Sequence, residues 1–123
     1  MRTAFIVFAH GSRLAAANEA VFAVARALAA RGGHELVEAA FLDLAQPDLP
    51  GAIDRLVGRD AERIVIIPYF LTPGRHAAED LNGMLAELAR QYAPVRIEAT
   101  DTLDGHPALE TAVLDRARQA LES

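Results

Sequence analysis

The sequence predicts an α/β protein built on a doubly wound, four-stranded parallel sheet with helices on both faces. Short apolar runs rich in Ile and Val alternate along the chain with longer segments whose apolar residues recur at helical spacing. This order occurs four times, and it is typical of parallel strands joined by right-handed crossover helices. A length of 123 residues is enough to bury a hydrophobic core, so we expect a single domain over residues 1–123.

The expected strands are short runs of apolar and β-branched residues. The first is apolar throughout, as expected of a strand buried on both faces, and the third contains the sequence Ile-Val-Ile-Ile. The four strands cover about residues 3–8, 35–42, 63–68 and 95–99.

The expected helices have ends marked by glycine, proline or aspartate. Gly32-Gly33 ends the first helix, Asp48 begins the second, Gly58 ends it, and Pro94 follows the third. The helices cover about residues 18–31, 48–58, 77–92 and 107 onward. The last helix has an apolar stripe that we expect to face the core, made of Leu109, Val113, Leu114, Ala117 and Leu121.

Composition narrows the classes of function. Cysteine is absent, so any transition metal would be bound by imidazole or carboxylate. A net charge of −5 with scattered arginines argues against nucleic-acid binding. No apolar run reaches the length of a membrane span, the first residues do not resemble a signal peptide, and no glycine-rich nucleotide motif occurs. We therefore expect a cytoplasmic protein with no membrane or nucleic-acid partner and no organic cofactor.

Ionisable side chains follow all four expected strands. Ligands of parallel sheets bind at this carboxyl edge. The residues at the strand ends, or in the loops that follow, are His10, Asp43, His76 and Asp101. Imidazole binds Co²⁺, Ni²⁺, Fe²⁺ and Zn²⁺, and two histidines with one carboxylate leave coordination positions open. The pattern predicts an open metal site centred on His10 and His76.

Each of these residues also has a structural interpretation. His10 could hydrogen-bond to backbone near a glycine turn, and His76 could cap a helix. Arg13 and Arg75 could be solvated loop residues, or they could bind substrate carboxylates in a bidentate manner. Backbone N–H groups of Gly11-Ser12 could bind an anion at a helix start. The other two histidines are expected in an exposed turn, His34, and at the start of the last helix, His106.

Four segments together resemble the small CbiX-type sirohydrochlorin chelatases. They are residues 8–12 (FAHGS), 40–47 (AFLDLAQP), 68–71 (PYFL) and 74–76 (GRH), and the resemblance extends to the Gly105-His106-Pro107 start of the last helix. It implies ATP-independent insertion of Co²⁺, or in relatives Fe²⁺ or Ni²⁺, into sirohydrochlorin, in cobalamin or sirohaem biosynthesis. It also implies that His10 and His76 lie at the metal and act in catalysis. Metallation removes water from the ion and two protons from the pyrroles, and neutral imidazole can serve as ligand or proton acceptor.

The resemblance also implies contacts with the tetrapyrrole. The residues expected to make them are Ser12, Arg13, Asp43, Phe70 and Arg75. Asp43 stands where the family often has Glu, and its shorter side chain reaches less far. Larger chelatases resemble two such units fused, so this chain is expected to form a homodimer with the tetrapyrrole between subunits. The apolar segment 69–71 would then stack on the macrocycle or line the interface.

Two other functions fit part of the pattern. Histidine phosphatases also have His-Gly after the first strand, but with an arginine directly before it, where this chain has Ala9. A non-enzymatic metal or tetrapyrrole carrier would use the same residues without turnover.

Overall fold

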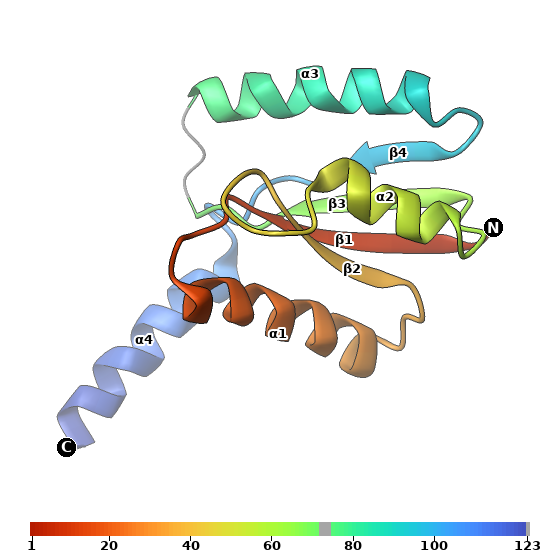
Figure 1. Ribbon diagram of the computed structural model, residues 1–123. Coiled ribbons are helices and arrows are strands. Elements are labelled where there is room, and N and C mark those ends of the chain that lie inside the picture. The colour runs from red at the N-terminus through yellow and green to blue at the C-terminus, as the bar shows by residue number, and fades with distance from the viewer. Residues whose placement is uncertain (72–74, 123) are drawn as a thin grey trace.

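The computed structural model describes residues 1–71 and 75–122, without the side chains of residues 75–78. Strands and helices alternate along the chain (Figure 1). The strands are β1 (Thr3–Ala9), β2 (Val37–Phe41), β3 (Arg63–Pro68) and β4 (Arg96–Ala99). The helices are α1 (Ala15–Gly32), α2 (Leu49–Val57), α3 (Arg75–Gln91) and α4 (Pro107–Glu122). The α/β class predicted from the sequence is confirmed.

The four strands form one parallel sheet in the order β2-β1-β3-β4. Strand β1 is hydrogen-bonded on both sides, with Val7 in register with Ala39 of β2 and Ile67 of β3. The carboxyl end of β1 therefore lies inside the sheet, flanked by the ends of β2 and β3.

Two apolar clusters hold the sheet between its helices. Helices α2 and α3 cover one face and α1 covers part of the other (Figure 1). The larger cluster includes fully buried residues of β1, α2 and β3, namely Ile6, Phe8, Ile53, Leu56, Ile64 and Ile66. The smaller cluster joins Val21 and Ala25 of α1 to Val7, Ala39 and Phe41. Alternate side chains of β1 enter the two clusters, as the period of a strand requires.

The helix boundaries follow local chemistry. Helix α1 begins at Ala15 instead of the expected Asn18, because the alanines at 15–17 favour helix. Asp48 caps α2 by accepting a hydrogen bond from the N–H of Gly51 at 2.9 Å, as expected. Helix α3 begins at Arg75 instead of Ala77, which places His76 in its first turn.

Helix α4 contradicts the expected packing. Its apolar stripe was expected to face the core, but none of its residues is buried. Val113, Leu114 and Leu121 are 69%, 64% and 88% exposed. The reason lies in the preceding loop, where the N–H of Leu103 donates to the carbonyl of Phe70 at 3.2 Å. From this loop the helix projects away from the sheet (Figure 1).

Candidate functional site

The ends of β1 and β2 are joined closely beside His10. The N–H of Asp43 donates to the His10 carbonyl at 3.0 Å, and the N–H of Leu42 donates to the Ala9 carbonyl at 2.9 Å. Gly11 follows with φ of +89°, and a Cβ there would lie 1.8 Å from the carbonyl oxygen of Asp43. Only glycine satisfies both the dihedral angle and the close approach. Gly11 thus allows the backbone of His10 to stay fixed against the end of β2.

The imidazole of His10 rests on an aromatic support. Its ring centroid lies 4.4 Å from that of Phe70, which packs edge-on against Phe8 at 5.9 Å. The N–H of Tyr69 donates to the Phe8 carbonyl at 2.7 Å and anchors the segment after β3. The His10 side chain is exposed. The hydrogen bonds of the described residues include none to this imidazole.

A hollow of about 160 Å³ opens beside His10. Its lining combines apolar side chains with two ionisable groups, in the set Phe8, His10, Leu42, Phe70, Asp80, Leu81 and Met84. Sequence reasoning did not single out Asp80. Asp80 lies four residues after His76 on α3, and residues at this spacing share one face of a helix. That spacing was the signal that could have identified it.

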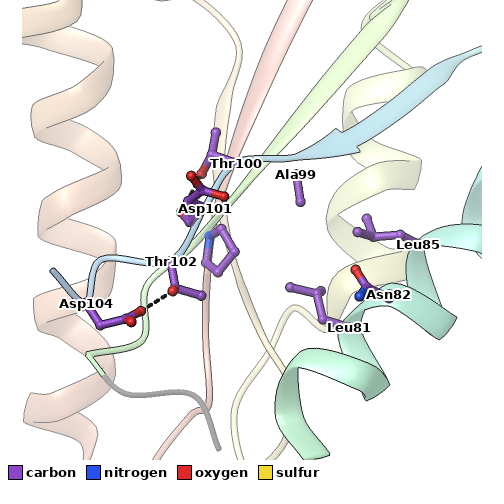
Figure 2. Close-up of a pocket in the computed structure, with 9 residues that line it drawn as sticks. Leu81, Asn82, Leu85, Ala99, Thr100, Asp101, Thr102 and Asp104 are labelled. Carbon is purple, nitrogen blue, oxygen red and sulfur yellow. Dashed lines mark hydrogen bonds between the residues drawn. The ribbon is translucent and has the colours of Figure 1, made fainter. Parts of the chain in front are cut away.

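A second and larger hollow, of about 510 Å³, lies at the carboxyl ends of β3 and β4 (Figure 2). Leu81 lines both hollows, so they adjoin along the same edge of the sheet. The polar part of the lining comes from the loop after β4, where the Thr102 hydroxyl donates to the carboxylate of Asp104 (Figure 2). Asp101 also lines this hollow, in agreement with its predicted place at the carboxyl edge.

Ser12 and Asp43 make local hydrogen bonds. The backbone N–H of Ser12 donates to Oδ1 of Asn18 at 2.9 Å, and its Oγ accepts from the N–H of Leu14 at 3.0 Å. This N–H is therefore already used, which argues against the possible anion site at Gly11-Ser12. Oδ1 of Asp43 accepts from the N–H of Leu44 at 2.8 Å, and Asp43 does not line the hollow beside His10. The carboxylate nearest to that hollow is Asp80.

Part of the predicted site falls outside the described residues. This holds for the side chains of His76 and Arg75, although both residues lie in α3. Arg13 is exposed and forms no ion pair with a described residue. Within the described side chains, no three of the His, Asp and Glu residues are grouped so that they could hold a metal ion. His10 and Asp80 would need a third group, such as His76.

The other two histidines have structural roles. Nδ1 of His106 accepts from the N–H of Ala108 at 3.0 Å at the start of α4, which confirms its expected role at a helix start. His34 was expected in an exposed turn, but it is half-buried because its ring packs against Phe5 with centroids 4.5 Å apart. Phe5 pairs with Val37, the first residue of β2, so His34 lies near the amino edge of the sheet.

A parallel sheet with an exposed histidine over a hollow at its carboxyl edge defines an α/β protein with an open ligand site. The chain belongs to the CbiX family, whose family model matches residues 4–120. It is 31% identical over 116 residues to the chloroplastic sirohydrochlorin ferrochelatase of Arabidopsis thaliana, covering 94% of this chain and 52% of the relative. It is 28% identical over 138 residues to the sirohydrochlorin cobaltochelatase of Methanopyrus kandleri, covering 96% of each. The chain thus spans about half of the plant relative and nearly all of the archaeal one.

Two similar solved structures also differ in length, one being about as long as this chain and the other about twice as long. A putative CbiX protein of cobalamin biosynthesis from Marinobacter aquaeolei VT8 superposes with a TM-score of 0.86 at 28% identity, covering 98% of both chains. The sirohydrochlorin chelatase SirB of Bacillus subtilis subspecies spizizenii, in complex with cobalt, superposes with a TM-score of 0.87 at 25% identity. That match covers 97% of this chain and 51% of SirB. The fold therefore occurs both in chains of about this length and in chains about twice as long.

Proposed function

We propose that this protein inserts a divalent metal ion into sirohydrochlorin without ATP. The observation that carries the proposal is His10, an exposed imidazole packed on Phe70 beside a hollow, just after the central strand. Membership of the CbiX family supports it, as do relatives named sirohydrochlorin cobaltochelatase and ferrochelatase. We take Co²⁺ as the metal substrate, with Fe²⁺ and Ni²⁺ as alternatives, because imidazole and carboxylate ligands accept all three.

In this proposal the metal ion binds between β1 and α3. His10 supplies one ligand from the strand. His76 and Asp80, one helical turn apart on α3, supply the opposite side, and the Asp80 carboxylate offsets part of the charge of the incoming cation. Three protein ligands leave coordination positions for water and for the pyrrole nitrogens. Such a site can hold the ion and then release it into the macrocycle.

The tetrapyrrole would lie over this edge of the sheet. Arg13 and Arg75 are our candidates for its carboxylates. Ser12 and Asp43, in the loops after β1 and β2, are our further candidates for contacts with it. Phe70 is 6% exposed, so we assign it mainly to supporting His10. Tyr69 and Leu71 of the same segment are 39% and 63% exposed, and we assign the contact with the macrocycle to them.

Localisation and oligomeric state are a separate part of the proposal. We propose a cytoplasmic homodimer in which residues 1–123 act as one domain, with no organic cofactor. No described helix is long and apolar enough to cross a membrane.

A chelation assay tests the proposal. Purified protein is mixed with sirohydrochlorin and Co²⁺, and the absorbance change of metallation is followed against the spontaneous rate. We expect acceleration, and a loss of about 100-fold or more in His10→Ala and in His76→Ala. His34→Ala is the matched control, because this histidine lies near the amino edge of the sheet, and it should retain activity. Circular dichroism checks that each variant is folded. Absence of acceleration, or full activity in both site variants, would refute the proposal.

A further inference from the structure

Leu44 has a backbone conformation that leucine rarely adopts. Its φ is +66°, in the left-handed region where the Cβ of an L-residue crowds the backbone. Within residues 1–71 and 75–122, one other residue besides glycine has a positive φ, Asp60 at +67°. The short polar side chain of aspartate tolerates this conformation because it can bond to nearby backbone, whereas an aliphatic side chain cannot. Leucine at position 44 therefore lowers stability where Gly, Asn or Asp would not.

The fold does not offset this loss by burying the side chain. Leu44 is 53% exposed, and it belongs to neither apolar cluster of the described chain. An exposed leucine is ordinary on a protein surface, but one in a strained conformation gives up stability without the burial that normally stabilises leucine. Backbone strain of this kind is concentrated at ligand sites. The side chain of Leu44 is therefore a candidate for contact with a ligand.

The loop that carries Leu44 is fixed at both of its ends. At its start, the N–H groups of Leu42 and Asp43 are bonded to backbone carbonyls at and just after the end of β1. At its end, the carbonyl of Pro47 accepts a hydrogen bond from the N–H of Phe41 at 2.9 Å. Oδ1 of Asp43 also accepts from the N–H of Leu44 itself at 2.8 Å. The strained residue is thus held by its neighbours, and its side chain is presented on a fixed loop.

We propose that Leu44, together with Leu42, contacts one face of the tetrapyrrole on the β2 side of His10. Leu42 is 45% exposed and lines the hollow beside His10, so this loop lies next to the proposed metal site. The N–H of Asp43, between the two leucines, is bonded to the carbonyl of His10 and keeps the loop at that place. The inference rests on the proposed function, which supplies the substrate, and it assigns two further residues that bind it.

A broad apolar ring fits this place because exposed apolar side chains flank His10 on both sides. Strand β1 lies between β2 and β3, so the loops that follow these two strands lie on opposite sides of His10. One loop carries Leu42 and Leu44, and the other carries Tyr69 and Leu71. Neighbouring strands are about 4.8 Å apart, so the two flanks are separated by about 10 Å. A tetrapyrrole macrocycle can span both flanks with its centre over His10.

Equilibrium binding of sirohydrochlorin in the absence of metal tests the assignment. The tetrapyrrole is titrated with protein and its absorbance is followed. We expect Leu44→Gly to weaken binding about tenfold, because glycine removes the apolar contact. The same variant should unfold at a urea concentration equal to or above that of the wild type, because glycine adopts a positive φ without strain. Weaker binding without loss of stability distinguishes a ligand contact from a structural role.

Asp60→Gly is the matched control. It places glycine at a φ of almost the same value, in the turn between α2 and β3 at the amino edge of the sheet, and it should leave sirohydrochlorin binding unchanged.

Four results would overturn the inference. They are a wild-type chain that does not bind sirohydrochlorin, a Leu44→Gly variant that binds it as tightly as the wild type, a Leu44→Gly variant that is less stable, and a change of mass in light scattering. The third would show that Leu44 packs within its own fold, and the fourth that it contacts a second copy. Chelation is assayed separately, so a wild-type chain that binds sirohydrochlorin without metallating it would count against the proposed function alone.

Discussion

Replacing Gly11 by alanine tests whether the close junction of β1 and β2 is needed for the fold. The new Cβ would lie 1.8 Å from the Asp43 carbonyl oxygen, well inside van der Waals contact, at a φ of +89°. Separating the two chains would weaken the hydrogen bonds that Leu42 and Asp43 donate to β1. Two lost bonds at about 1 kcal/mol each, with about 1–2 kcal/mol for a non-glycine residue at positive φ, give a loss of about 3–4 kcal/mol in the free energy of unfolding.

Gly33→Ala is the matched control for this prediction. Gly33 also has a positive φ, of +71°, but a Cβ there would meet nothing within 4 Å. We expect it to cost only about 1 kcal/mol, the penalty for the backbone conformation. Urea denaturation followed by circular dichroism gives both values. If Gly11→Ala cost no more than Gly33→Ala, the close approach to Asp43 would not matter to stability and the reasoning would be wrong.

Three further substitutions test separate parts of the structure. Asp48→Ala removes the cap of α2 and should lower the free energy of unfolding by about 1 kcal/mol in the same denaturation experiment. Burial and the hydrogen bond to Asp54 raise the pKa of Tyr92 to about 12, so the folded state holds this proton more tightly than the unfolded chain. The stability that Tyr92 contributes is complete below pH 10 and should be lost as the pH rises towards 12, and thermal melts of Tyr92→Phe should lack this decline. Asp80→Asn should weaken Co²⁺ binding about tenfold by calorimetry, whereas Glu87→Gln, on the same helix but outside the hollow, should not.

Much of the fold could be predicted because the elements have strong local signals. The Ile-Val-Ile-Ile run identified β3, and the stop at Gly32-Gly33 identified the end of α1 within one residue. The place of His10 also followed, since the carboxyl end of a parallel strand is where ligands bind.

What the sequence did not predict depends on long-range packing. The stripe of α4 correctly indicated an amphipathic helix, but a stripe carries no information about which surface covers it. The burial of Phe70 under His10 results from the way the segment after β3 is bonded back to β1. Asp80 was missed because the hollow that gives it a role is formed by side chains from four separate parts of the chain.

The central position of β1 determines how the site behaves when the protein fluctuates. Its backbone is hydrogen-bonded to neighbours on both sides, up to the residue before His10. Its amide protons can therefore exchange with solvent only when the whole sheet opens, whereas those of the uncovered α4 exchange through local fraying. We therefore expect the backbone of His10, which directly follows this strand, to be among the last parts of the molecule to open.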